Sequence, residues 1–344
     1  MIDLRSDTVT LPSQAMKDFM FNAPLGDDVY GEDPSINLLE EKASKIFGKD
    51  NALFVPSGTM ANLISVLSHC NRGEEIVLGN KSHIFKYEAG GTSVFGGIHS
   101  HQIPNNDDGT LNIDDIVSSI HLSDDSHYAI TRLLCLENTH NLCYGTPIKS
   151  EYFKDVKKTI TPFNISIHID GARIFNAAIA LDESVKTLAE TADSITCCLS
   201  KGLSCPSGSL IMGNHQFINK ARRLRKSLGG GMRQAGILAA AGLYALDHMV
   251  DRLEEDHVNA QHLAQELVNI DNIKVDLEKV TTNLVFFDLE SDIISDNDFI
   301  QALLEQDVKI DGKGNHRFRM ATHFGFINND IEKVIKAIKF VLEK

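Results

Sequence analysis

Short apolar runs alternate with helical patterns over the first two thirds of the chain. The runs predict buried strands at 52–55, 76–78, 133–136, 165–169, 195–199 and 209–212. The spacing of apolar residues predicts helices over 35–47, 60–67, 151–158 and 217–227. Strands that are apolar throughout and separated by helices are typical of a mostly parallel sheet covered on both faces. The pattern therefore predicts an α/β protein.

The pattern changes after about residue 246. A long charged helix is expected over 250–267, followed by a strand at 284–289, a helix at 298–306, a pair of strands and a last helix. Apolar residues share one face of that last helix at a spacing of 3.6 residues; they are Ile331, Val334, Ile335, Ile338 and Leu342. We expect an extended N-terminal arm (1–12), a large domain (13–246) and a small C-terminal α+β domain (247–344).

Composition and charge narrow the classes of function. A chain of 344 residues with 42% hydrophobic residues can bury a large core, and its formal net charge of −14 disfavours nucleic-acid or anionic membrane partners. The charged N-terminus resembles no secretory signal, and the apolar stretch 235–246 is too short to span a bilayer. The six cysteines form no CxxC pair, which favours a reduced cytoplasm and a packing role for the thiols.

Two charged residues follow predicted buried strands. Lys201 comes just after the strand 195–199, and Asp170 closes the strand 165–169. Ligands of α/β proteins bind at this carboxyl edge of the sheet, and a buried carboxylate needs a partner such as a protonated pyridine nitrogen. Taken alone, Lys201 also fits an ordinary surface lysine. Asp170 also fits a helix cap or an ion pair with Arg173.

A third feature is the turn Ser57-Gly58-Thr59 between a strand and a helix. Its hydroxyls, backbone N–H groups and positive helix end are suited to a phosphate, although a simple N-cap also explains it. Phosphate turn, acid and lysine occur together in this order. Pyridoxal phosphate (PLP) requires those three parts: a phosphate anchor, a partner for the pyridine nitrogen and a Schiff-base lysine. No residue is assigned to a metal.

The sequence resembles the low-specificity L-threonine aldolases, PLP enzymes of fold type I. The resemblance covers essentially the whole chain and rests on the segments 3–10, 26–34, 56–59, 137–141, 168–175, 200–203 and 229–234. It implies a large domain with a mostly parallel seven-stranded sheet and a small C-terminal domain. It also implies aldol cleavage of L-threonine and L-allo-threonine to glycine and an aldehyde, in a homo-oligomer built as a dimer of dimers.

The resemblance assigns roles residue by residue. Lys201 forms the Schiff base, and Asp170 keeps the pyridine nitrogen protonated. His83 stacks on the cofactor ring, and His127 lies near the substrate hydroxyl, so that either histidine could be the general base. The residues implied to contact the cofactor are Ser57, Gly58, Thr59, His83, Asp170, Arg173, Ser200, Lys201 and Arg233. The residues implied to bind the substrate are Ser6, Tyr30, Arg173 and Arg319.

Some of these assignments leave alternatives open. The segment after His323 departs from the family pattern, so Arg317 competes with Arg319 for the substrate carboxylate. Tyr30, Lys226 and Arg233 are expected at a site shared between subunits. The same fold also supports β-elimination or transamination, and a PLP-binding protein without catalysis is a further alternative. A nucleotide-dependent dehydrogenase is disfavoured because the chain has no glycine-rich dinucleotide fingerprint.

Overall fold

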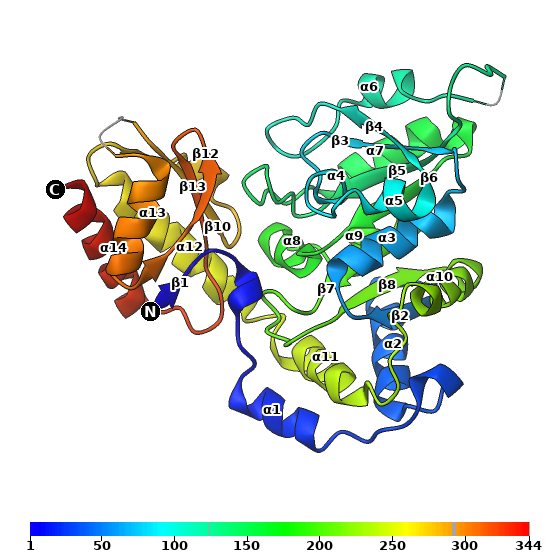
Figure 1. The fold of residues 1–344 in the computed structure, drawn as a ribbon, viewed down its shortest axis with the longest axis horizontal. Coiled ribbons are helices and arrows are strands. Elements are labelled where there is room, and N and C mark those ends of the chain that lie inside the picture. The colour runs from blue at the N-terminus through cyan, green and yellow to red at the C-terminus, as the bar shows by residue number, and fades with distance from the viewer. Residues whose placement is uncertain (123, 291–293, 344) are drawn as a thin grey trace.

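The computed structural model describes residues 1–122, 124–290 and 294–343. Its centre is a seven-stranded sheet with the strand order β2-β8-β7-β6-β5-β3-β4 (Figure 1). The strand β8 is antiparallel to both of its neighbours, whereas all other strands run in one direction. The strands are β2 Asn51–Val55, β3 Glu75–Gly79, β4 His99–Ile103, β5 Thr131–Glu137, β6 Ser166–Asp170, β7 Ser194–Cys198 and β8 Ser209–Gly213.

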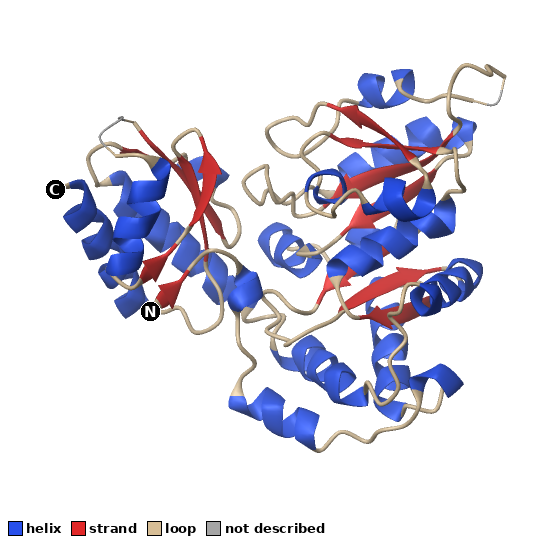
Figure 2. Ribbon diagram, viewed as in Figure 1, coloured by secondary structure: helices blue, strands red, loops and turns tan. Residues whose placement is uncertain are grey.

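Helices cover this sheet on both faces (Figure 2). They are α1 Gln14–Phe21, α2 Pro34–Phe47, α3 Gly58–His69, α4 His83–Lys86, α5 Gly91–Gly96, α6 Ile113–Ser118, α7 Ser150–Ile160, α8 Ile174–Leu181, α9 Val185–Ala189, α10 His215–Ser227 and α11 Gly236–His248. Three short 3-10 helices lie beside them, at Asp7–Val9, Asp28–Tyr30 and Thr161–Phe163. With both faces covered, the central strands are buried, which explains their continuous apolar runs.

The C-terminal part forms a separate, smaller sheet of order β12-β13-β10-β9. Its elements are α12 Leu253–Val268, β9 Ile273–Lys274, a 3-10 helix Leu277–Lys279, β10 Leu284–Leu289, α13 Asp296–Glu305, β11 Val308–Lys309, β12 Asp311–Gly314, β13 Arg317–Ala321 and α14 Asn328–Leu342. The first residues of the chain join this part: β1 (Ile2–Asp3) pairs in parallel with β11, and Leu4 is buried in its core.

The two largest hydrophobic clusters follow this arrangement. The larger core extends from Met16 to Leu253, and a separate one combines Leu4 with apolar residues between Ala260 and Val341. We propose on this basis that the chain has two domains, with the N-terminal strand assigned to the smaller one.

The predicted strands of the large sheet are confirmed, but β4 was not anticipated. Its sequence His-Ser-His-Gln-Ile (99–103) has no apolar run. The strand lies at the edge of the sheet, beside β3 alone, so its side chains are mostly not buried. An edge position removes the apolar pattern on which the strand prediction depends.

Two further expectations concern the cysteines and membrane-spanning helices. All six cysteines are buried and unpaired, which confirms the packing role expected of them. Among the described residues, no helix combines the length and the apolar character needed to cross a bilayer.

Candidate active site

The chemically important segments meet at one edge of the large sheet. Asp170 is the last residue of β6, and Lys201 follows the end of its neighbour β7. The turn after β2 leads to Ser57, and the turn after β3 leads to His83. Because these strands run in the same direction, their carboxyl ends lie at the same edge, where α/β folds bind ligands.

A pocket of about 370 Å³ opens at this edge. It is lined by Ser6, Thr8, His83, Tyr87, Asn141, Arg173, Lys201, Asp311, Lys313 and Arg319. Both domains contribute, since Asp311, Lys313 and Arg319 belong to the smaller sheet. Sequence reasoning found Ser6, His83, Arg173, Lys201 and Arg319 but did not identify the other five lining residues.

Asp170 is buried and held by neutral donors. Its Oδ2 accepts a hydrogen bond from Asn62 Nδ2 at 2.8 Å, and its Oδ1 accepts one from the backbone N–H of Ala172 at 3.1 Å. The side chain of Asn62 is fixed by two further residues: its Oδ1 accepts a hydrogen bond from Thr196 Oγ1 and lies 3.2 Å from His168 Nε2. Burial lowers the pKa of His168 to about 3, so this ring is neutral at pH 7. The carboxylate therefore has no cation among its hydrogen-bond donors.

The alternative in which Asp170 pairs with Arg173 is wrong. The guanidinium of Arg173 binds Asp7 through Nε and Nη2, both at 2.7 Å. Burial raises the pKa of Asp7, but the charge and hydrogen bonds of Arg173 lower it by more, so this carboxylate is ionised. The pair anchors the N-terminal segment, which carries Ser6, to the large domain. Asp7 was missed as a functional residue because nothing in the sequence indicates which arginine it meets.

Arg173 and Arg319 converge on one acceptor. Nη1 of Arg173 donates to Oδ1 of Asn141 at 3.0 Å, and Nη1 of Arg319 donates to the same oxygen at 2.8 Å. The second terminal nitrogen of Arg319 binds Asp311 Oδ2 and the carbonyl oxygen of Arg5. Two guanidinium groups directed at one oxygen provide the donors that a substrate carboxylate requires.

The competing arginine lies elsewhere. Arg317 donates through Nε and Nη2 to the carboxylate of Asp288, at 2.7 and 2.8 Å, and its guanidinium lies over the ring of Tyr144. It does not line the pocket. The two arginines lie on the same strand, β13, but only Arg319 lines the pocket.

His83 is held at the pocket by two carboxylates. Its backbone N–H donates to Glu137 Oε2 at 2.7 Å, and its ring Nδ1 lies 2.9 Å from Oε1 of Glu88. The other oxygen of Glu137 accepts from the backbone N–H of Asn141 at 2.8 Å. Glu137, at the end of β5, thus positions residues on two walls of the pocket. Glu88 is nearly fully buried and was not identified from the sequence, because it lies outside the motifs that carry the resemblance.

The turn at 57–59 begins α3 beside the strand that leads to Lys201. Ser57 caps the helix, with its Oγ accepting from the backbone N–H of Met60 at 3.2 Å. A Cβ atom on Gly58 would lie 2.7 Å from the sulfur of Cys198, so only glycine fits so close to β7. The helix N-terminus, with its free N–H groups, is therefore next to the end of β7, a few residues from Lys201. This placement suits the phosphate of a cofactor held by that lysine.

The structure does not bring every predicted residue to the pocket. His127 does not line it: its side chain is 86% exposed and contacts Asp125, on the segment leading into the amino end of β5. The pocket lies at the carboxyl edge, so the length of β5 separates His127 from the pocket of its own chain, and the role expected for His127 stays a prediction. Tyr30 and Arg233 also lie outside it, close to each other on the surface, with the Arg233 guanidinium 5.8 Å from the Tyr30 ring centre.

The residues present fit PLP. A lysine lines the pocket, a buried carboxylate without a cationic donor lies at the adjacent strand end, and a glycine-containing helix N-terminus lies next to it. These are the attachment point, the partner for a protonated ring nitrogen and the phosphate anchor that the cofactor needs.

Comparisons with known proteins agree with this interpretation. The model of the beta-eliminating lyase family matches residues 3–290. The low-specificity L-threonine aldolase 1 of Arabidopsis thaliana is 44% identical over 341 residues, covering 98% of this chain and 95% of its own. The low specificity L-threonine aldolase of Escherichia coli (strain K12) is 49% identical over 286 residues, covering 83% and 84%.

The solved structure of Leishmania major threonine aldolase has the same fold. It superposes with a TM-score of 0.82 at 19% identity and covers 99% of this chain and all of its own. The protein is thus an α/β, PLP-dependent enzyme of fold type I and belongs to the beta-eliminating lyase family. Within that class it belongs to the family of low-specificity L-threonine aldolases.

Proposed function

We propose that the protein cleaves L-threonine and L-allo-threonine to glycine and acetaldehyde, and cleaves related β-hydroxy amino acids in the same way. The observation that carries the proposal is that Lys201, which follows β7, and Arg319, which belongs to the smaller sheet, line one small pocket, with Asp170 buried at the adjacent strand end. The names of the relatives give the reaction, and this geometry is suited to it.

Each residue of the site has its own task in the proposed reaction. Lys201 would hold PLP covalently through its side-chain amine, in the pocket that also receives the substrate. PLP supplies an electron-accepting ring that takes up the electron pair of the breaking Cα–Cβ bond. Asp170 supports that uptake, because its negative charge favours the protonated form of the ring nitrogen. Arg319 and Arg173 bind the carboxylate, which fixes the orientation of Cα and aims Cβ at the cleavage direction.

His83 is the candidate for the base that removes the β-hydroxyl proton. Its Nδ1 is engaged with Glu88, which leaves Nε2 as the nitrogen that can accept a proton in the pocket. A histidine suits this task because its pKa lies near neutrality. Either His83 or His127 was expected to be the general base, but His127 lies outside the pocket of its own chain. We therefore propose that His83 serves both threonine diastereomers, directly or through a water molecule.

A second candidate is β-elimination, which the description of the matching family favours. The two reactions break different bonds and give different products. Incubation with L-threonine followed by assays for glycine, acetaldehyde and ammonia separates them. Glycine and acetaldehyde in equal amounts support the aldolase, whereas ammonia and a keto acid support elimination.

We propose that the enzyme is a cytoplasmic homo-oligomer, a dimer of dimers, with a role in threonine breakdown and glycine formation. The six unpaired cysteines suit a reducing compartment. The surface around Tyr30, which is 74% exposed, and Arg233 lies outside the pocket of its own chain, which suits a contribution to a neighbouring subunit. The acidic net charge disfavours nucleic-acid partners.

A further inference from the structure

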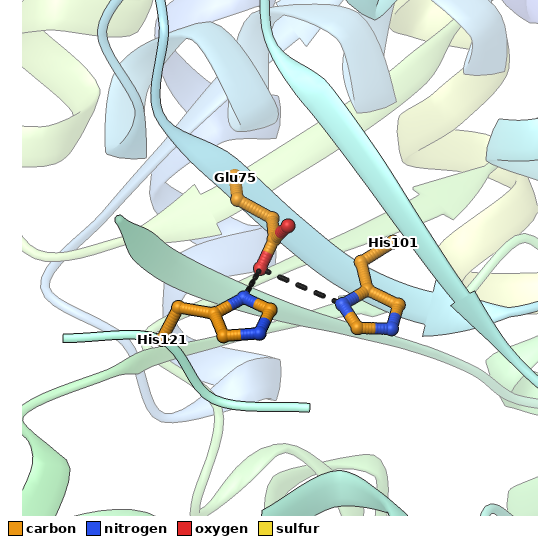
Figure 3. A group of neighbouring side chains, drawn as sticks. All are labelled: Glu75, His101 and His121. Atoms are coloured by element: carbon orange, nitrogen blue, oxygen red, sulfur yellow. Dashed lines mark hydrogen bonds and ion pairs between the residues drawn. The ribbon is translucent and has the colours of Figure 1, made fainter. Parts of the chain in front are cut away.

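Three side chains with metal-ligating atoms meet at the edge of the large sheet that lies opposite the pocket. Glu75 is the first residue of β3, His101 lies on the neighbouring strand β4, and His121 lies in the segment between α6 and β5. Oε1 of Glu75 lies 3.1 Å from Nδ1 of His121 and 3.7 Å from Nδ1 of His101. Figure 3 shows both imidazole rings directing a nitrogen at this one oxygen.

Hydrogen bonding alone accounts for only part of this arrangement. The His121 contact is within hydrogen-bond distance, but 3.7 Å from His101 is too long. In a tetrahedral zinc site with bonds of 2.0–2.2 Å, neighbouring ligand atoms lie about 3.3–3.6 Å apart. The two observed distances bracket that range, and the ligand atoms of all three residues lie within 4.8 Å of one another.

We propose that Glu75, His101 and His121 bind a divalent cation of the zinc class. Two imidazoles and one carboxylate select zinc and similar transition metals, whereas magnesium and calcium prefer sites made only of oxygen. Three protein ligands leave a fourth position for water. His99 lies close by, with its Nε2 3.5 Å from the second oxygen of Glu75, and is not required as a ligand.

The surroundings support a defined site. Glu75 is 2% exposed, and its Oε1 also accepts a hydrogen bond from Thr131 Oγ1 at 2.8 Å, which fixes the carboxylate. Such outer contacts orient the ligands of metal sites. The rings of His101 and His121 are partly exposed, so that a metal can enter from solvent. The ring of Tyr128 stacks on the ring of His121, with the two ring centres 4.2 Å apart.

The site would tie a loop to the sheet. His121 and Thr131 close the base of the intervening segment: the His121 N–H donates to Thr131 Oγ1 at 2.9 Å, and the Thr131 N–H donates to the His121 carbonyl at 3.0 Å. A metal would add a link from this base to β4, the edge strand of the sheet. Because the site lies at the edge of the sheet opposite the pocket, its role is structural, and metal removal should lower the Tm while leaving the catalytic residues in place.

Zinc titration of the PLP-loaded, chelator-treated enzyme tests the proposal. Isothermal titration calorimetry should show one saturable zinc per chain. The variants His101→Gln and His121→Gln, which keep a polar side chain but lose the imidazole, should each weaken binding at least about tenfold. His248→Gln is the control. His248 is exposed and lies outside this cluster and outside the second cluster of candidate ligands described below, so the variant should bind zinc as the wild type does.

Two results need to be distinguished from loss of the proposed site: zinc binding at another cluster, and unfolding of a variant. His83, Glu88 and Asp170 form the other cluster of candidate ligands, so zinc bound there would keep its affinity in both variants. Far-UV circular dichroism and PLP absorbance show whether each variant is folded. If either variant is unfolded, anomalous scattering at the zinc edge from crystals of the wild type locates the metal instead. Absence of saturable binding, unchanged affinity in either folded variant, or anomalous density elsewhere would overturn the proposal.

Discussion

Nδ1 of His83 lies 2.9 Å from Oε1 of Glu88, a carboxylate that is nearly fully buried and within hydrogen-bond reach of Asn62 as well. Burial lowers the pKa of His83, but the hydrogen bond to Glu88 and the charge of Asp170 raise it by more, so its net pKa lies above the usual value. Burial, together with the charge of Asp170, also raises the pKa of Glu88. Because the pKa values of His83 and Glu88 are both raised, this pair holds a proton readily, which suits a group that accepts a proton during the reaction.

The variant Glu88→Gln tests this relationship. A base acts in its unprotonated form, so the raised pKa of His83 places the acidic limb of the kcat profile at higher pH. The amide removes the negative partner that raises the pKa of His83, so the limb should move to lower pH. A pH profile of kcat measures the shift. The same limb in the variant would show that His83 does not titrate in catalysis, whereas a loss of PLP absorbance would indicate a structural defect.

Asp170→Asn should reduce kcat strongly without unfolding the chain. The amide can still accept from Ala172, but it no longer carries the charge that favours a protonated ring nitrogen. We expect a loss of at least about a hundredfold, the scale seen when one group that stabilises developing charge is removed. Steady-state kinetics, with PLP absorbance and thermal melting as controls, give the answer. Near wild-type kcat with bound PLP would mean that Asp170 is not the ring partner.

Arg319→Ala should raise KM for L-threonine by at least about tenfold, because a charged, bidentate contact contributes about 1.5–3 kcal/mol. Arg317→Ala is the matched control on the same strand. It loses a part-exposed ion pair with Asp288 and the contact with the Tyr144 ring, both outside the pocket, so its KM should stay within about twofold of the wild type. The reverse outcome, with the large effect in Arg317→Ala, would reassign the carboxylate site.

Mixing two inactive variants tests whether subunits share a site. If Arg233 serves the site of a neighbour, hybrids of Lys201→Ala and Arg233→Ala contain one intact site per pair. Random mixing should then restore about a quarter of wild-type activity. Mixing Lys201→Ala with Asp170→Asn is the control, because both residues serve the pocket of one chain, and it should restore none. If the first mixture is as inactive as the second, Arg233 does not complete the site of another subunit.

The sequence was sufficient for the parts of the fold that depend on local pattern. Buried strands such as β6 and β7 have continuous apolar runs, and Asp170 and Lys201 follow their ends, so the carboxyl edge of the sheet could be predicted as the site. The strand β4 could not, because its edge position leaves polar histidines in place of an apolar run. Strand periodicity reports burial, and an edge strand is not fully buried.

Side-chain partners over long sequence separations were beyond the sequence. The pairing of Arg173 with Asp7, 166 residues away, excludes the alternative in which Arg173 pairs with Asp170. The location of His127 depended on which edge of the sheet its loop occupies, and the family resemblance carries a role but not the chain's own geometry. Glu88 acts through His83 and lies outside the motifs, so no motif indicates it. Glu137 lies in a motif segment, but its contacts with the backbone N–H groups of His83 and Asn141 cannot be read from the sequence.

The central claim is that Lys201 and its pocket perform aldol cleavage, and glycine release from L-threonine by the wild type and by Lys201→Ala tests it most directly. The wild-type protein should be yellow, should form glycine and acetaldehyde in equal amounts and should be inactivated by borohydride. Lys201→Ala should fold, should lose the borohydride-stable link to PLP and should retain almost no turnover. Full turnover or an unchanged borohydride-stable link in Lys201→Ala, or a wild type that forms no glycine from threonine, would contradict the account.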